Sequence, residues 1–296
     1  FEVFREHNDK CVQLSGTDMA PATVQRYETS LKHTRDFVWE TYHKKDVLLD
    51  EVSRQFIEDY EFWLKTEKKC CHNTATKYLK NFKKITRIAL AKGWMKNDPF
   101  LEIRFSLDKV EPDFLEDSEI QKLISKEIDI PRLSQVRDIF VFCCFTGLAF
   151  SDIHGLRKEH IVEDSNGVRW IRKGRQKTKI MCNIPLMEIP LKILEKYSTN
   201  EYCKKHGVLF PVLCNQKMNA YLKELADICG IKKTLTTHVG RHTFATFALA
   251  NGVSIESVAK MLGHTNVQMT RHYARVLDRT VIREMSQIKM DLHFSM

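Results

Sequence analysis

Apolar residues at helical spacing run through the first hundred residues with few interruptions. From Thr23 to Tyr42 they recur every three or four positions, with no Gly or Pro inside the run. The same spacing continues from about Ser53 to Lys65, and again from Asn73 or Thr74, either of which is a good N-cap, to Gly93. These runs predict a front part built almost entirely of helices.

A short acidic segment divides the chain. Residues 109–118 (KVEPDFLEDS) contain a proline and four carboxylates, and their apolar residues show no helical period. A chain of 296 residues commonly forms more than one domain. We therefore predict a helical domain at 1–108, a linker at 109–118 and a second domain at 119–296.

The second domain changes character part-way along. Apolar spacing predicts helices at about 118–126, 134–145 and 149–157. Short β-type runs then follow at 160–162, 167–171 and 180–186, and helical spacing returns beyond Pro190. The basic stretch 172–179 is predicted to form a hairpin tip between the last two strands. The fold class is mainly α, with one small antiparallel sheet in the second domain.

Charge and cysteine content narrow the class of function. The chain has 47 Lys and Arg against 38 Asp and Glu, which favours an acidic partner such as nucleic acid. No stretch approaches 18 consecutive apolar residues, so no membrane-spanning helix is predicted. Nine cysteines without a CxxC pair, in a chain of this length, predict reduced thiols in a cytoplasmic protein. The chain begins at Phe1 and shows no leader sequence, which we interpret as a processed or cloned fragment.

Basic residues concentrate between Lys65 and Lys96, where ten of them accompany one acid, Glu67. Four fall three or four positions apart and therefore share one helical face: Lys77, Lys80, Lys84 and Arg87. A solvated helix face is the plain alternative, but such faces usually mix both signs of charge. We predict that these four side chains contact DNA phosphates.

The last sixty residues carry the strongest candidate for chemistry. His238 and Arg241 are three apart on one helical face, His264 follows Gly263 at a helix end, and Tyr273 lies nine residues further on. Together they offer a cation and imidazoles for a phosphate's charge, and a phenol oxygen that can attack phosphorus. Taken singly, His264 could simply cap a helix and Tyr273 could be a core aromatic. A zinc site at His238 and His242 is disfavoured because the glutamate of the metalloprotease motif is missing.

Together with the neighbouring sequence, this set of residues resembles the tyrosine recombinases, the phage-integrase family of site-specific DNA recombinases. The matching segments are His238-x-x-Arg241, Leu262-Gly263-His264, Tyr273, the predicted hairpin sequence RQKTKIMCNIPL and Thr146-Gly147-Leu148. In the front domain, Asn73-Thr74, Tyr78 and the segment from Asn97 to Phe100 resemble the family's helical, SAM-like core-binding domain. The resemblance covers essentially the whole chain.

The resemblance implies a role for each matched residue. Tyr273 would be the nucleophile that forms a 3′-phosphotyrosyl link, and Arg241 would hold the non-bridging phosphate oxygens with help from His238 and His264. Lys177 on the hairpin tip would be the general acid, with Lys173 and Lys179 as close rivals. Three further hairpin residues are expected to contact DNA: Arg172, Lys173 and Arg175. No metal, ATP or other cofactor is implied.

One residue departs from the family pattern. The family's first arginine is expected in a T-G-x-R motif, and this chain has Ala149 there. We predict that another cation substitutes, with Arg137 preferred and Arg157 as the alternative, or that the protein is weakened or inactive. Arg137 could instead pair with Asp138 or a neighbouring helix. The same departure resembles integrases of conjugative transposons and related mobile elements from Bacteroidetes-type bacteria.

The expected function is therefore DNA strand exchange that integrates or excises a mobile element. The expected partners are double-stranded DNA at recombination sites, a Holliday junction, three further copies in a tetramer and accessory DNA-bending proteins. The expected location is the bacterial cytoplasm, at the nucleoid, without membrane contact. The amphipathic residues 281–296 are predicted to dock on a neighbouring subunit or, alternatively, to pack on their own domain. A non-catalytic DNA-binding protein and a type IB topoisomerase-like relaxing enzyme are the alternative functions.

Overall fold

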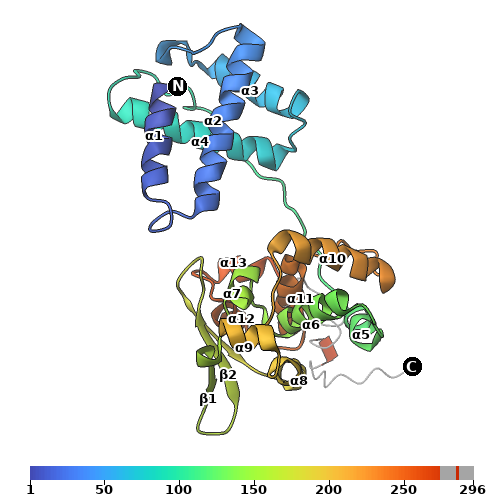
Figure 1. Cartoon of the computed structure of the whole chain (residues 1–296). Coiled ribbons are helices and arrows are strands. Elements are labelled where there is room, and N and C mark those ends of the chain that lie inside the picture. The colour runs from blue at the N-terminus through green and yellow to red at the C-terminus, as the bar shows by residue number, and fades with distance from the viewer. Residues whose placement is uncertain (274–284, 287–296) are drawn as a thin grey trace, which may run out of the picture. The chain divides into compact units, whose positions relative to one another are not determined.

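The computed structural model describes residues 1–273 and 285–286. The chain divides into two compact units, Phe1–Val110 and Glu111–Met296, and the division falls inside the predicted linker (Figure 1). Both units are mainly helical, and the second contains a three-stranded antiparallel sheet. The predicted fold class is confirmed.

The first unit is helical throughout. Its elements are α1 (Glu2–Gln13), α2 (Pro21–Tyr42), the 3₁₀ turn η1 (Leu49–Glu51), α3 (Arg54–Thr66) and α4 (His72–Ala91). Aromatic side chains from α2, α3 and α4 meet in its core, where Phe37 lies edge-on to Phe56 and tilted against Tyr60. These three rings are almost completely buried, so the apolar faces of the helices pack together around one aromatic core.

The start of α4 differs from the prediction. Its N-cap is Cys71 rather than Asn73 or Thr74. The Asn73 side chain instead pairs with the backbone of Asp108, donating from Nδ2 to Asp108 O and accepting at Oδ1 from Asp108 N. A tertiary contact to the chain leaving the unit has therefore replaced the local cap that the sequence indicated.

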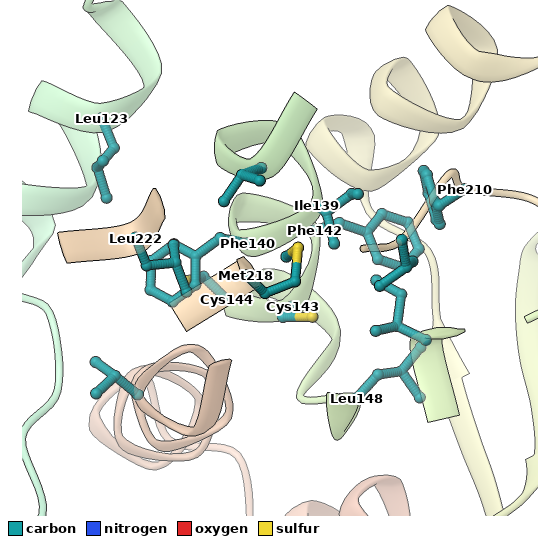
Figure 2. Close-up of a cluster of buried hydrophobic side chains, with 14 of the residues drawn as sticks. Leu123, Ile139, Phe140, Phe142, Cys143, Cys144, Leu148, Phe210, Met218 and Leu222 are labelled. Atoms are coloured by element: carbon teal, nitrogen blue, oxygen red, sulfur yellow. The ribbon is translucent and has the colours of Figure 1, made fainter. Parts of the chain in front are cut away.

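The second unit is built around α6 (Pro131–Thr146). Ten of its sixteen residues are buried, so the helix is covered on almost every side. Figure 2 shows Leu123 of α5 (Asp117–Ser125), Met218 and Leu222 of α10 (Asn215–Ile228) and Phe210 gathered around its apolar side chains. Phe142 of α6 contacts Phe210 with 4.7 Å between ring centroids. This rigid core holds the C-terminal end of α6, at Gly147, in a fixed place.

The sheet has the order β1–β2–β3, with β1 (Ile161–Glu163), β2 (Arg169–Gly174) and β3 (Met181–Pro185) all antiparallel. Lys173 pairs with Cys182, and Gly174 with Met181. The predicted hairpin tip is therefore too long, because residues 172–174 belong to β2. The actual turn comprises residues 175–180, with Arg175 N donating to Ile180 O.

Short helices complete the second unit. They are α7 (Phe150–His154), the 3₁₀ turn η2 (Lys158–His160), α8 (Glu188–Tyr197), α9 (Glu201–His206), α11 (Thr237–Ala250), α12 (Ile255–Leu262) and α13 (Gln268–Arg271). The helix expected at 149–157 is shorter than predicted and ends before Gly155. All nine cysteines are free thiols. Within residues 1–273 and 285–286, no helix combines the length and apolar character needed to cross a membrane.

Candidate active site

Arg241 lies at the centre of the candidate site, on α11. The first turn of this helix is held by α10, because Asn219 Oδ1 accepts from the otherwise unpaired Thr237 N. Arg241 is only 2 % exposed, and its guanidinium donates to Gly147 O and Leu262 O at 2.7 Å each. These carbonyls end α6 and α12, where the helix dipoles favour a positive charge. A fully buried cation is therefore tolerated, and it ties three helices together.

His264 contacts Arg241 directly. Gly263 adopts the left-handed conformation after α12, and His264 N then donates to Ala259 O, as in a Schellman-type helix end. This turn aims the ring inward: Nε2 lies 3.0 Å from Arg241 Nη2, and Nδ1 lies 2.9 Å from Thr270 Oγ1. Since arginine can only donate, Nε2 is the acceptor and Nδ1 carries the proton. Burial, followed by the charges of Arg241 and Arg175, lowers the pKa of His264 to about 4.

Tyr273 lies against this pair within the same unit. Its side chain is 8 % exposed and belongs to a small apolar cluster with Phe244 and Leu262. The ring stacks on His264 at 6.0 Å between centroids and meets His242 edge-on at 4.9 Å. The Tyr273 hydroxyl has no hydrogen-bond partner among the described residues. The predicted nucleophile is thus positioned by packing of its ring against two histidines.

His238 lies one helical turn before Arg241, at the exposed rim of the site. Its ring meets His242 edge-on, with 4.3 Å between centroids. Partial burial of the ring lowers the pKa of His238, and the charges of Arg241, Arg175 and Lys177 add to the effect. The lowered pKa favours the neutral imidazole, the form that can accept a proton.

Lys177 reaches the site through the β2–β3 turn. Two contacts dock this turn: Gln176 N donates to Asp152 Oδ1 at 2.9 Å, and Thr178 Oγ1 donates to Gly263 O. Lys177 lies between these anchors, is exposed, and is close enough for its charge to act on His238. The turn thus brings the predicted general acid within electrostatic range of His238, at the rim of the site.

The two rival lysines differ from Lys177 in their surroundings. Lys173 is half-buried, because its Nζ donates to Gly155 O at 2.9 Å and lies 3.5 Å from His160 Nε2. Lys179 is exposed, with a left-handed backbone at the far side of the turn. The placement favours Lys177 over Lys173, whose ammonium group is engaged beneath α7.

The sequence did not predict that Arg175 lies inside the site. It was expected to contact DNA as part of the hairpin, but its side chain is only 11 % exposed and points into the site. Arg175 Nε lies 3.6 Å from Oδ2 of the buried Asp152. The charge of Arg175 acts on both Arg241 and His264, lowering the pKa of each after the larger effect of burial. Its place in the basic stretch 172–179 was the signal that the sequence offered.

Arg137 does not join this cluster. Its guanidinium binds Asp138 Oδ1 through Nε and Nη2, at 3.1 Å each, and Nη1 donates to Lys126 O at the end of α5. Ten residues of α6 separate it from Gly147, a rise of about 15 Å. The preferred substitute for the missing arginine is thus misplaced, and pairing with Asp138, the alternative, is what the structure shows. Arg157 is exposed and lines a separate hollow beside α8 and α9.

The site as a whole is strongly cationic. Arg241, Arg175 and Lys177 converge with one carboxylate, Asp152, and neutral imidazoles. Such an arrangement suits an anion of one or two charges, such as a phosphate diester. Within the described part of the chain, no group of three or more His, Cys, Asp or Glu side chains is arranged to hold a metal ion.

A basic surface on the first unit is the second feature of interest. Lys77, Lys80, Lys84 and Arg87 are exposed on α4, and none forms an ion pair with a described carboxylate. At the two ends of the basic stretch, by contrast, Lys65 pairs with Glu61 and Lys92 pairs with Glu6. The central residues are thus an unneutralised patch, as a DNA contact requires.

Aromatic rings lie beneath this patch. Lys80 lies 5.7 Å from the centre of the Phe105 ring, and Lys84 lies 4.9 Å from that of Tyr27 and donates to its hydroxyl. Part of the patch, together with Phe105, lines an open hollow of about 610 Å³. The lysine stems are therefore supported by the unit while their charges remain available to a partner.

Comparison with known proteins gives the family. Residues 1–107 match the phage integrase SAM-like domain, and residues 113–280 match the phage integrase family. The chain belongs to the phage integrase family. It is a tyrosine recombinase, an enzyme of site-specific DNA recombination.

Curated relatives match over most of their length. A tyrosine recombinase of Pseudothermotoga lettingae is 29% identical over 265 residues, which cover 87% of this chain and 88% of the relative. Tyrosine recombinase XerD of Oceanobacillus iheyensis is 26% identical over 266 residues, which cover 86% and 87%. The resemblance seen in the motifs thus extends through both units.

Solved structures share the fold at lower identity. A lambda integrase dimer bound to a COC′ core site has a TM-score of 0.73 at 16% identity, covering 100% of this chain and 99% of that one. The Tn1549 transposon integrase in complex with a circular intermediate DNA has a TM-score of 0.72 at 16% identity, covering 97% and 98%. XerH bound to a palindromic difH substrate has a TM-score of 0.73 at 14% identity, covering 96% and 94%.

Proposed function

We propose that the chain is the integrase of a mobile element, which cuts and rejoins double-stranded DNA through a 3′-phosphotyrosyl intermediate on Tyr273. The observation that carries the proposal is the stacking of Tyr273 on His264, while His264 accepts a hydrogen bond from the buried Arg241. Nucleophile, imidazole and guanidinium are thereby assembled in one unit.

The chemistry is a balanced exchange of phosphate esters. Tyr273 Oη attacks the scissile phosphorus, the P–O5′ bond breaks, and its electron pair leaves with the 5′-oxygen. A new phosphotyrosyl ester replaces the old diester, so the reverse attack by a 5′-hydroxyl rejoins DNA without ATP. Arg241 has five N–H groups and uses three on Gly147, Leu262 and His264, which leaves two for the non-bridging oxygens.

Proton transfer falls to the residues around this centre. Lys177 donates its proton to the leaving 5′-oxygen, because the docked turn brings an exposed ammonium to the site. His238 accepts the proton of Tyr273, since its lowered pKa keeps the ring neutral. His264 has both nitrogens engaged, so it orients Arg241 and supports the Tyr273 ring.

The patch on α4 and the exposed Arg172 of β2 would bind the phosphate backbone. DNA as partner is supported by the neighbours described as DNA complexes, and the mobile-element role by the Tn1549 transposon integrase in particular. Complete exchange cuts four strands, so we propose a tetramer on two DNA sites with a Holliday-junction intermediate, assisted by DNA-bending proteins. Bacterial relatives favour action in the cytoplasm at the nucleoid. The predicted docking segment, 281–296, lies outside the described residues apart from 285–286.

The test is covalent capture on DNA. A library of duplexes with a randomised 30-base-pair core and a nick in one strand would trap the enzyme, because the short 5′-hydroxyl fragment diffuses away after cleavage. Adducts that survive denaturation are isolated, and the attached strands are sequenced to identify the best site. We expect an adduct joined at a DNA 3′-phosphate with the wild-type chain and none with Tyr273→Phe.

Three other results would each change the conclusion. DNA binding without any adduct would indicate a non-catalytic DNA-binding protein. Sequence-independent adducts accompanied by relaxation of supercoiled plasmid would indicate a topoisomerase-like enzyme. An adduct retained by Tyr273→Phe would show that another residue is the nucleophile.

A further inference from the structure

Ala149 leaves a carboxylate in an unusual position. Ala149 is the N-cap of α7, and Asp152 lies three residues on, in the first turn of that helix. Asp152 is 1 % exposed. A buried carboxylate without a cation is strongly unfavourable, and an arginine at position 149 would lie on the same helical face, close to it. With alanine at 149, the compensating charge has to come from elsewhere in the fold.

Arg175 supplies that charge from the β2–β3 turn. Its Nε lies 3.6 Å from Asp152 Oδ2, while the other oxygen of Asp152 accepts from Gln176 N, the next residue of the turn. The same carboxylate thus holds both the side chain of Arg175 and the backbone beside it. This double contact fixes the direction in which the guanidinium points.

Packing restrains the rest of the Arg175 side chain. It lies against Gly263, because a Cβ placed on Gly263 would come within 2.8 Å of Arg175 Cδ and 2.7 Å of Cys182 Sγ. Gly263 precedes His264, whose Nε2 contacts Arg241. Arg175 is therefore pressed between α7 and the turn that carries His264, beside the Arg241 guanidinium.

The terminal nitrogens of Arg175 are unused. Neither Nη1 nor Nη2 has a hydrogen-bond partner among residues 1–273 and 285–286, although the side chain is only 11 % exposed. Two guanidinium groups close together repel each other unless an anion lies between them. A phosphate bound between Arg175 and Arg241 would offset this repulsion.

We propose that Arg175 is the second phosphate-binding arginine of the active site and replaces, from the hairpin, the arginine missing at Ala149. Its Nη groups bind a non-bridging oxygen of the scissile phosphate opposite Arg241, and Asp152 is the residue that positions it. The inference rests on the proposed function, since it concerns the phosphate of the same cleavage step.

The experiment uses the full-length chain and the nicked duplex selected by covalent capture. Arg175→Ala is compared with Arg175→Ala/Asp152→Asn, which removes the buried carboxylate charge yet keeps an acceptor for Gln176 N. Arg169→Ala is the matched control, because Arg169 is exposed on the same strand and, among the residues the structure describes, forms an ion pair with Glu163 alone. Thermal melting and gel shift report folding and DNA binding of each variant.

We expect both Arg175 variants to bind DNA and to form adduct about 100- to 1,000-fold more slowly than wild type, with the control unchanged. Adding Ala149→Arg to Arg175→Ala should recover at least tenfold, because the new arginine lies next to Asp152. A duplex with a neutral methylphosphonate at the scissile position should reduce the deficit of Arg175→Ala below tenfold, since the charge that Arg175 neutralises is then absent.

Each opposite result is decisive. Adduct formation by the folded double variant within about threefold of wild type would overturn the role of Arg175 while leaving the proposed function intact. A deficit that is equally large on the methylphosphonate duplex would assign Arg175 a purely structural role. No adduct with the wild-type chain would overturn the proposed function and, with it, this inference.

Discussion

Replacing Gly147 by alanine should damage both stability and chemistry, because this residue joins the core to the active site. Gly147 ends α6 with φ of 66°, a left-handed conformation that costs a non-glycine residue about 1–2 kcal/mol. Its carbonyl accepts the 2.7 Å hydrogen bond from Arg241 Nη1. A new Cβ would overlap Phe244 Cδ1 and lie 2.8 Å from Leu262 Cδ2. Overpacking of this kind adds about 1–3 kcal/mol.

Gly207 provides the matched control. It ends α9 in the same left-handed conformation, with φ of 65°, but a Cβ there meets no atom within 4 Å. Gly207→Ala therefore carries the conformational cost without the packing cost. The difference between the two variants should be about 1–3 kcal/mol of unfolding free energy, or roughly 2–12 °C in melting temperature for a unit of this size.

Thermal melting of the full-length variants measures this difference, and covalent capture on the selected duplex measures the chemistry. We expect Gly147→Ala to melt lower than Gly207→Ala and to form adduct more slowly per folded molecule, because Phe244 and the Gly147 carbonyl are displaced. Equal melting temperatures would refute the packing argument. A low melting temperature with undiminished adduct formation would refute the link from Gly147 to Arg241.

Three further perturbations test other parts of the structure. His264→Gln should flatten the pH dependence of stability. Because the pKa of His264 is lowered to about 4 in the folded protein, the unfolded chain binds the proton more readily, and the wild type loses about 1–2 kcal/mol of unfolding free energy as pH falls from about 6.5 to 4, after allowance for partial exposure. Equal slopes of melting temperature against pH for the variant and the wild type would contradict this. Lys80→Gln/Arg87→Gln should reduce the slope of log binding constant against log salt concentration for duplex DNA by about two. Lys92→Gln, which loses an ion pair with Glu6, should leave this slope unchanged. A larger effect of Lys92→Gln would place the DNA elsewhere. Arg137→Ala should lower stability by about 1–3 kcal/mol through the loss of its bonds to Asp138 and Lys126 O, without slowing adduct formation per folded molecule; a folded but inactive variant would return Arg137 to the active site.

Local sequence predicted much of this molecule because local spacing has a direct physical meaning. The apolar period of 23–42 became α2 within two residues at its start, and the β-type run at 180–186 became β3. The left-handed turn at Gly263 directed His264 inward, as a glycine after a helix indicates. The three-residue spacing of His238 and Arg241 places both on one side of α11, so this pair could be recognised from the sequence.

Contacts between distant segments were decided only by the tertiary fold. Arg137 was expected beside an apolar run and Arg175 in a basic hairpin tip, and nothing in their spacing showed which would face Arg241. The register of β2 on β3 and the docking of their turn on Asp152 and Gly263 brought Arg175 in, while Asp138 and the end of α5 held Arg137 away. The sequence by itself determined the helices, the strands and the reactive groups. Which cation stands beside the phosphate depends on the packing of residues that lie far apart in the chain, and local spacing does not encode that packing.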